Sequence, residues 1–195
     1  MGASPGRPTL QPRWKRAAKR MAIAALVMLG AAGGYIGFLL LSGNIHTVVA
    51  GQFYRAGQLN QSELEHVIGE DGIRSILNLR GAHPNAPWYD TELAVAKAHG
   101  VTHYDFGLSA ERVVTPAQID SILAILRSAP KPILIHCQGG ADRSGLVAAL
   151  YEAKIIGTSS ADADRQLSLR YGHFPYLGSK TVAMDQSYWA YVNEL

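Results

Sequence analysis

Cysteine is nearly absent from this chain of 195 residues, in which Cys137 is the only one. A single cysteine cannot form a disulfide within the chain, so disulfides do not hold this fold together. A lone cysteine in an ordinary setting is usually a small buried apolar residue. The role of Cys137 therefore has to be judged from the residues around it.

Acidic residues are missing from the first 20 positions, which carry six Lys and Arg, and no charged residue of either sign occurs in residues 21–41. An apolar helix of about 20 residues is long enough to cross the hydrocarbon core of a bilayer. We therefore expect a basic flank at residues 1–20 and a transmembrane anchor at residues 21–41. A cleaved signal peptide is the alternative, but apolar sequence continues past the weak cleavage-like triplet at residues 31–33.

The basic flank also predicts the orientation of the anchor. Lys and Arg accumulate on the cytoplasmic side of membrane spans, so the N-terminus is expected in the cytoplasm. The rest of the chain would then lie on the far side. The expected localisation is a single-pass membrane protein with an extracytoplasmic domain, which is periplasmic in a bacterium and luminal in a eukaryote.

A basic surface is also missing from the remainder of the chain. Without the six N-terminal bases, the 18 Lys and Arg fall to 12 against 15 Asp and Glu, a net charge of −3. Nucleic-acid binding, which needs a basic stripe or patch, is therefore not expected. Internal repeats and low-complexity segments are absent too, so residues 44–195 are expected to form one domain with a full core.

The most informative segment is residues 136–145, which read His-Cys-Gln-Gly-Gly-Ala-Asp-Arg-Ser-Gly. An apolar run precedes it and a helix-compatible run follows, which predicts a strand, a tight loop and the start of a helix. Free N–H groups at a helix N-terminus stabilise both a thiolate and a bound phosphate. Gly139 and Gly140 allow successive N–H groups to turn inward and form an anion-binding nest.

The side chains of this loop predict phosphoryl transfer in two steps. Arg143 carries a planar guanidinium that can hold two phosphate oxygens at once. Cys137 would attack phosphorus in line to form a phosphocysteine, which water then hydrolyses. Ser144 would hydrogen-bond the sulfur and make it a better leaving group, and His136 would orient the loop. The phosphate is expected to bind the intervening residues, Gln138, Gly139, Gly140 and Ala141.

The pattern His-Cys-x-x-Gly-x-x-Arg-Ser-Gly resembles the signature loop of the cysteine-dependent protein tyrosine and dual-specificity phosphatases. Residues 51–58 and 72–80 resemble the opening of small bacterial and plant/fungal-type atypical dual-specificity phosphatases. The resemblance implies a tyrosine-phosphatase-like fold and a phosphomonoester substrate, with no cofactor and no metal. A rhodanese-like sulfur carrier fits less well, because five residues separate Cys137 from Arg143 and Ser144 follows.

The leaving oxygen needs a proton, which a carboxylic acid usually supplies. The resemblance implies an aspartate on a separate loop, but residues 101–112 hold none at the expected position. Asp142 is the first candidate, because some bacterial relatives carry an aspartate within the signature loop and are thought to use it. Glu111 is the second candidate and Asp105 the third.

Two arginines outside the signature loop also bear on the site. Arg80 follows an apolar strand, and loops at such strand ends line the ligand crevice of α/β sheets. It is expected to assist phosphate binding or to shape the substrate rim, and a surface salt bridge is the alternative. The alternative for Asp142 is a carboxylate that pins the loop or pairs with Arg80 or Arg55.

Short apolar runs and helix-like segments alternate along the rest of the chain. Strands are expected at residues 48–49, 53–55, 73–79, 101–108 and 132–136, and helices at residues 62–72, 88–99 and 115–128 and from Ser144, Ser160 and Ser179. This alternation predicts an α/β fold with a central, mostly parallel sheet flanked by helices and preceded by one transmembrane helix.

Three functions remain open at this stage. The first is a membrane-anchored protein tyrosine or dual-specificity phosphatase, whose partner is a phosphorylated protein. The second is a phosphatase for a small phosphorylated metabolite, such as an inositol phosphate, an inositol pyrophosphate or a phosphoinositide. Gln138 and Ala141 stand where such relatives usually carry lysines, although Arg55 and Arg80 could compensate. The third is a catalytically weak phosphate-binding module, which only the missing loop aspartate supports.

Overall fold

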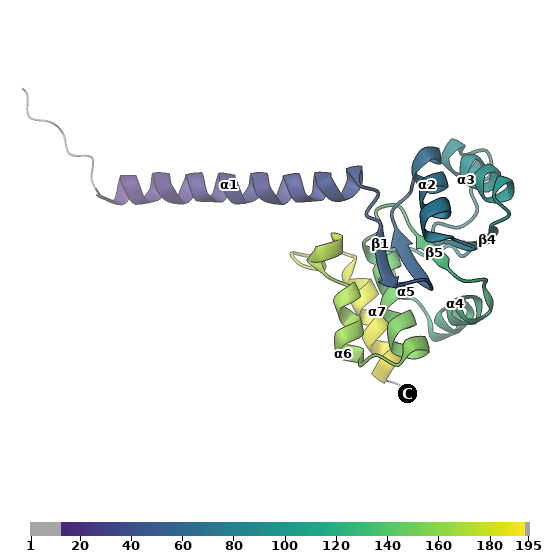
Figure 1. The fold of residues 1–195 in the computed structure, drawn as a ribbon. Coiled ribbons are helices and arrows are strands. Elements are labelled where there is room, and N and C mark those ends of the chain that lie inside the picture. The colour runs from purple at the N-terminus through teal and green to yellow at the C-terminus, as the bar shows by residue number, and fades with distance from the viewer. Residues whose placement is uncertain (1–12, 194–195) are drawn as a thin grey trace, which may run out of the picture. The chain divides into compact units, whose positions relative to one another are not determined.

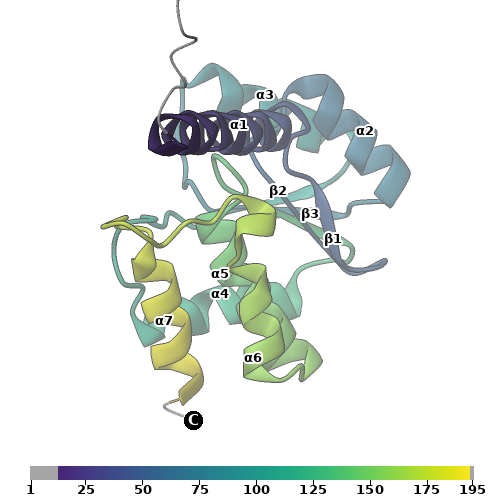
Figure 2. The same cartoon turned by 90° about the vertical axis from the view of Figure 1, so that its left-hand side faces the viewer.

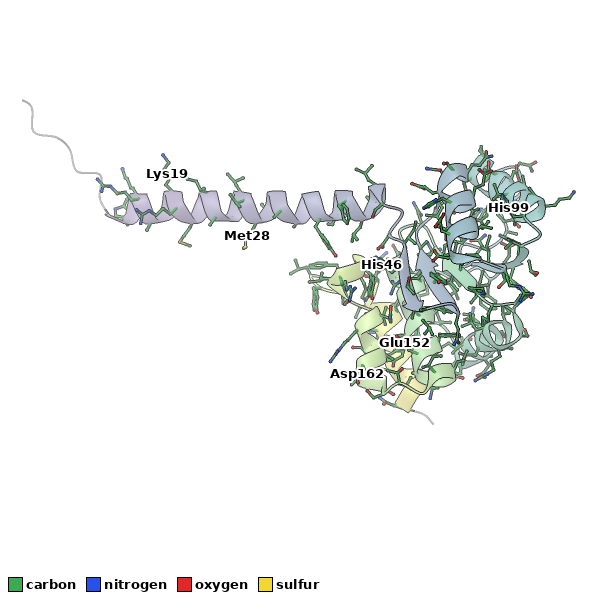
Figure 3. All side chains as sticks on the ribbon, viewed as in Figure 1. Lys19, Met28, His46, His99, Glu152 and Asp162 are labelled. Atoms are coloured by element: carbon green, nitrogen blue, oxygen red, sulfur yellow. The ribbon has the colours of Figure 1, made fainter. Side chains whose placement is uncertain are left out.

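The computed structural model describes residues 13–193. The chain divides into two units, Met1–Phe38 and Leu39–Leu195. Helix α1 (Arg13–Leu41) occupies the described part of the first unit and ends within the second (Figure 1). Figure 3 shows Lys19 and Met28 on this helix. Residues 1–12 of the expected basic flank lie outside the described part of the chain.

Helix α1 is long and apolar enough over Trp14–Leu41 to cross a membrane. Only 6% of its most apolar stretch is buried, which is unlike the core helix of a soluble domain. A signal sequence near an N-terminus would share this length and composition. The expected apolar helix is therefore present, and its membrane role is taken up below as a proposal.

The second unit is built on a five-stranded sheet in the order β1-β2-β5-β3-β4. Strand β1 (His46–Val49) is antiparallel to β2 (Phe53–Ala56), whereas β2, β5 (Ile133–His136), β3 (Ser75–Asn78) and β4 (Thr102–Asp105) are parallel. The expected α/β fold with a mostly parallel sheet is confirmed. Strand β5, which leads into the signature loop, is central and buried along its whole length.

Helices cover both faces of this sheet. They are α2 (Gln61–Asp71), α3 (Pro87–Ala98), α4 (Pro116–Ser128), α5 (Asp142–Tyr151), α6 (Ser160–Ala163) and α7 (Val182–Asn193). A π-helical turn, η1 (Glu152–Ile156), follows α5, and two 3-10 turns, η2 (Asp164–Gln166) and η3 (Leu169–Tyr171), precede α7. Figures 1 and 2 show α2 and α3 on one side of the sheet and the other four helices on the opposite side.

The two faces of β5 serve two apolar cores. Ile133 and Ile135 belong to the cluster formed with α4, α5 and α7, whereas Leu134 belongs to the cluster formed with α2 and α3. Successive side chains of a strand point to opposite faces, so a strand between two helical layers must be apolar at every position. This requirement explains the unbroken apolar run before His136.

One expected helix start is wrong. The helix expected at residues 62–72 begins at Gln61, because Asn60 forms a capping box before it: the Asn60 side chain accepts from the Glu63 N–H at 3.0 Å, and the Glu63 carboxylate accepts from the Asn60 N–H at 2.9 Å. An amide side chain caps as well as a hydroxyl, and the partner Glu63 stands three residues later, as a capping box requires. The helix expected at residues 115–128 is also preceded by a capping box, which Thr115 and Gln118 form.

Other element boundaries also differ from expectation. Strands β3 and β4 have four residues each and are shorter than residues 73–79 and 101–108. The helix after the signature loop begins at Asp142 instead of Ser144, because the Gly145 N–H already donates to the Ala141 carbonyl at 2.9 Å. The first turn of α5 therefore carries Asp142, which affects the argument about the general acid.

Candidate active site

The signature loop leaves the sheet at its centre. His136 pairs with Ala56 of β2 on one side and with Asn78 of β3 on the other. Cys137 follows directly, is 3% exposed, and donates its N–H to the Ala56 carbonyl at 3.4 Å. The carboxyl ends of three parallel strands thus surround the thiol, at the edge where α/β sheets bind ligands.

Gly140 is required by the shape of the loop. Its φ is +70°, and a Cβ there would lie 2.6 Å from the Gly57 nitrogen and 2.7 Å from the Ala56 carbonyl carbon. A side chain would therefore push the loop off the end of β2. A Cβ on Gly139 would meet no atom within 4 Å. Of the two glycines, only Gly140 therefore occupies a position where a side chain would not fit.

Arg55 braces the signature loop from behind. Its guanidinium donates to the Gly140 carbonyl at 2.7 Å and the Ala141 carbonyl at 3.0 Å, and its other end donates to Gln166. The Arg55 side chain is fully buried, and its guanidinium lies 4.0 Å from the centre of the Tyr171 ring. Burial lowers the pKa of Arg55 to about 10, so the guanidinium stays protonated at neutral pH. These bonds point the carbonyls of Gly140 and Ala141 toward Arg55 and away from the space where a phosphate would bind. Because its guanidinium is occupied by these bonds, Arg55 cannot replace the substrate-binding lysines that the loop lacks.

Arg143 reaches across the site toward the loops after β3 and β4. Its Nη1 donates to the Leu108 carbonyl at 3.2 Å and to the Leu79 carbonyl at 3.4 Å. Its Nε is buried without a hydrogen-bond partner among the described residues. A buried donor without a partner is costly. A phosphate oxygen would satisfy this one.

Ser144 lies beside the thiol end of the loop. It is fully buried, and its hydroxyl donates to the Ala56 carbonyl at 3.3 Å, the same oxygen that accepts from the Cys137 N–H. The hydroxyl and the nucleophile thus share one anchoring carbonyl. This position is compatible with the role expected from the sequence, a hydrogen bond to the sulfur.

Asp142 pairs with a histidine that the sequence did not connect to it. Its Oδ1 accepts from His173 Nδ1 at 2.7 Å, and His173 Nε2 donates to Asp185 at 2.9 Å. Burial of the ring would lower the pKa of His173, but the two carboxylates together raise it. The ion pair of Asp142 is thus with His173, on the segment before α7, and not with Arg80 or Arg55; a carboxylate that pins the loop stays an alternative.

The other two acid candidates are placed differently. Asp105 ends β4, where it accepts from Asn78 Nδ2 at 2.8 Å and from the Tyr89 hydroxyl at 2.5 Å; this hydrogen bond is the main reason that the pKa of Tyr89 rises to about 12. Glu111 is 60% exposed and lies 3.6 Å from Lys180. Of the three candidates, only Asp142 belongs to the loop that carries the thiol.

A cavity of about 450 Å³ lies at the loops after β3 and β4; it includes Leu108, whose carbonyl accepts from Arg143. Its lining consists of Arg80, Gly107, Leu108, Ser109, Arg112, Val113, Val114 and Gln118. The Arg80 guanidinium lies 3.6 Å from the centre of the Trp88 ring and donates to Gln58 Oε1 at 3.0 Å. Burial and the nearby charge of Arg143 lower the pKa of Arg80. Arg80 and Arg112 therefore line this cavity, and the Leu108 carbonyl connects its wall to Arg143.

Sequence reasoning missed Glu92, a buried carboxylate behind the loop. It is 3% exposed and accepts from His103 at 2.8 Å, His136 at 3.0 Å and Gln58 at 3.0 Å. Burial alone would raise its pKa, but these hydrogen bonds lower it to about 2. The available signal was spacing: Glu92 falls on the buried stripe of α3, three residues after Tyr89.

Glu92 is expected to make the stability of the fold depend on acid pH. Because its folded-state pKa lies below the ordinary 4.5, the stabilisation is present at neutral pH and is lost as pH falls toward about 2. Glu92→Gln should lower the free energy of unfolding by about 1–3 kcal/mol at pH 7 and flatten its decline below about pH 5. Thermal unfolding measured across this range provides the check, with exposed Glu70→Gln as the control. Parallel curves for Glu92→Gln and the wild type would contradict this account.

These features define a class of protein. A central parallel strand, a cysteine-to-arginine loop and a following helix together form an α/β phosphatase of the tyrosine and dual-specificity kind. The family model described as "DSP-PTPase phosphatase fused to NAD+ Kinase" matches residues 42–184. The chain therefore belongs to the DSP-PTPase family of phosphatases, as the signature loop predicted. No curated protein sequence matches the chain.

Solved structures support the same fold. TpbA from P. aeruginosa, in complex with phosphotyrosine, is 20% identical with a TM-score of 0.59, over 78% of this chain and 92% of that one. The core catalytic domain of the PP-IP phosphatase Siw14 from S. cerevisiae is 24% identical with a TM-score of 0.58, over 74% and 85%. PTPMT1 in complex with PI(5)P is 12% identical with a TM-score of 0.55, over 77% and 97%. At these identities the likeness establishes the fold.

Proposed function

We propose that this phosphatase hydrolyses phosphomonoesters through a phosphocysteine formed on Cys137. The observation that carries the proposal is the buried Nε of Arg143, a donor without a partner among the described residues, in the same loop as the thiol. A phosphate dianion would satisfy that donor and the N–H groups at the start of α5. Membership of the DSP-PTPase family supports the same chemistry.

Each member of the loop has a role in this proposal. Cys137 attacks phosphorus, and Arg143 together with the N–H groups of Gln138, Gly139, Gly140 and Ala141 stabilises charge on the nonbridging oxygens. The bonds from Arg55 to the Gly140 and Ala141 carbonyls support this, because they hold those carbonyls away from the phosphate. Ser144 assists departure of the cysteine in the second step.

We propose Asp142 as the general acid, ahead of Glu111 and Asp105. Its place in the first turn of α5, next to Arg143 and on the loop that carries the thiol, supports this role. An acid matters most for poor leaving groups, because these need a proton as the ester bond breaks.

Asp142→Asn is therefore expected to reduce turnover of an unactivated aryl phosphate by about 100-fold, with a smaller loss for an ester of an acidic phenol. The measurement is kcat across a series of aryl phosphates of increasing leaving-group pKa. Glu111→Gln and Asp105→Asn are the controls and should leave the slope of this series unchanged. Equal losses across the series for Asp142→Asn would assign Asp142 a purely structural role.

Protein phosphotyrosine, or a wider set of phosphorylated residues, is the first substrate class that we propose, in line with the phosphotyrosine complex of TpbA. A small, highly phosphorylated molecule is the second. One observation favours it: Arg80 and Arg112 line the cavity whose wall includes Leu108, a hydrogen-bond partner of Arg143, and could meet a second anionic group. Siw14, a PP-IP phosphatase, and PTPMT1, solved with PI(5)P, share the fold.

Arg112→Ala separates the two substrate classes. If the cavity takes a second anionic group, kcat/KM for an inositol polyphosphate should fall about 10-fold, while kcat/KM for a simple aryl phosphate stays near the wild-type value. The two substrates are assayed side by side with the full chain in detergent. If Arg112→Ala leaves kcat/KM at the wild-type value for both substrates, the result would favour the phosphoprotein class. Arg74→Ala, at an exposed position outside the cavity, is the control.

We further propose that α1 anchors the protein in a membrane, with a basic flank at residues 1–20, a span at residues 21–41 and the phosphatase domain at residues 44–195. Six basic residues before an uncharged run support a cytoplasmic N-terminus and an extracytoplasmic domain. A reporter that is active only outside the cytoplasm, fused after Leu195, tests the orientation. Activity from a cytoplasmic reporter at the same position would overturn it.

A further inference from the structure

Three large apolar side chains project from one loop of the phosphatase unit. Phe174, Tyr176 and Leu177 are 44%, 59% and 96% exposed. They belong to residues 174–177, the aromatic loop, which lies between η3 and α7 in the yellow-green part of the ribbon (Figure 1). The Phe174 and Tyr176 rings pack edge to face, with centroids 5.3 Å apart. Single exposed apolar residues are ordinary, but a cluster marks a contact surface.

Leu177 has no role in the folded unit that explains its conformation. Its φ is +56°, in the left-handed region that a branched residue adopts only with strain. Glycine would relieve that strain, and Gly178 follows directly at a φ of +81°. A leucine that is both strained and almost fully exposed therefore points to a contact outside this unit.

The base of the aromatic loop is fixed to the catalytic loop. His173 precedes Phe174, is fully buried, and donates to Asp142 at 2.7 Å and to Asp185 at 2.9 Å. Asp142 opens α5 and lies beside Arg143 in sequence. Anything that the loop tip binds is consequently held at a fixed distance from the signature loop.

The loop also begins where the apolar helix ends. The Tyr171 carbonyl accepts from Asn44 Nδ2 at 2.9 Å, and a Cβ on Gly172 would lie 3.3 Å from Leu39 Cδ1. Leu39 is 5% exposed and belongs to the last turn of α1. Five residues from Gly172 to Leu177 span at most about 18 Å, so the tip lies near the end of the apolar run.

We infer that the aromatic loop inserts into the headgroup region of the membrane that α1 spans, and so holds the signature loop at the lipid surface. The inference rests on the proposed anchor. Aromatic and leucine side chains are typical of membrane interfaces. The hydrocarbon core of a bilayer is about 30 Å thick and the whole bilayer about 40–45 Å, so each interfacial layer is about 5–8 Å deep and a tip close to the helix end is within reach of it.

A fluorescent label tests the contact without using enzymatic activity. The full chain carries Cys137→Ser, so that Leu177→Cys provides the only thiol for an environment-sensitive dye. Ile156→Cys is the matched control, an apolar residue that is 44% exposed on η1. In phosphatidylcholine and phosphatidylglycerol vesicles, the dye at 177 should shift to the blue and be quenched by spin-labelled lipid, and the dye at 156 should not. Equal quenching at both sites would overturn the inference, and so would a blue shift at 177 without quenching by spin-labelled lipid, because that would indicate contact with protein, such as a second copy, rather than with lipid.

A second experiment separates this inference from the proposed function. The combined variant Phe174→Ser, Tyr176→Ser and Leu177→Gly keeps His173 and the signature loop intact. Turnover of a soluble aryl phosphate should stay close to wild type, while turnover of a phosphoinositide presented in vesicles should fall several-fold. Equal losses on both substrates would assign the loop a structural role and overturn the inference. If the wild type hydrolyses neither substrate, the proposed phosphatase function fails while the labelling result still decides the membrane contact.

Discussion

Replacing Cys137 with serine should abolish turnover of an aryl phosphate, with a loss on the order of 10⁴–10⁶-fold in kcat. Serine has nearly the shape of cysteine, but its hydroxyl is not ionised near neutral pH and is a much weaker nucleophile than a thiolate. The measurement is steady-state hydrolysis by the full chain in detergent, with thermal unfolding to establish that the variant is folded.

The same variant should still bind phosphate, because the loop N–H groups and Arg143 are untouched. Protection of Cys137→Ser against thermal unfolding by inorganic phosphate or vanadate would demonstrate this binding. Turnover that survives in Cys137→Ser would contradict the phosphocysteine route. A wild-type chain that binds phosphate but shows no turnover would instead identify a phosphate-binding module.

The second large effect is expected at Arg143, where alanine should reduce kcat/KM about 10³-fold or more. Lysine should restore little of this loss. The guanidinium uses Nη1 to reach the Leu79 and Leu108 carbonyls and leaves Nε for a phosphate oxygen, and a single ammonium group cannot do both.

Both substitutions at Arg143 are measured against the same aryl phosphate as Cys137→Ser, together with phosphate binding by calorimetry. Arg74→Ala, an exposed arginine before β3, serves as the charge-matched control and should behave as wild type. Near wild-type turnover by Arg143→Lys would show that only the positive charge matters and would refute the geometric argument.

The sequence alone indicates Asp142 as a candidate acid, but it does not indicate the partner of Asp142. Asp142 stood out because it lies next to Arg143 in sequence, and this adjacency needs no fold to be seen. Its partner is His173, 31 residues further along the chain. Nothing local relates the two residues, since the contact exists only once α7 and the segment before it pack against α5.

The same limit applies to the residues that support the loop. Glu92 lies 44 residues from His136, and Arg55 lies 111 residues from Gln166. A glutamate within a helix suggests a solvated face, and an arginine in a strand suggests a surface charge. Both are buried because parallel strands bring distant segments to one edge of the sheet, where hydrogen bonds compensate the cost of burying charge.

The sequence by itself determined the class of protein, because the strand, the loop and the helix that carry Cys137 and Arg143 are consecutive and their chemistry follows from residue type and spacing. It also determined the layered α/β architecture and the long apolar N-terminal helix, because hydrophobic periodicity and helix caps are local properties. The tertiary structure decided which groups support the signature loop: Arg55 and Glu92 behind it, and His173 on Asp142. It also decided that Arg80 stacks on Trp88 at the cavity. These contacts depend on how remote segments meet in the fold, and no local pattern encodes them.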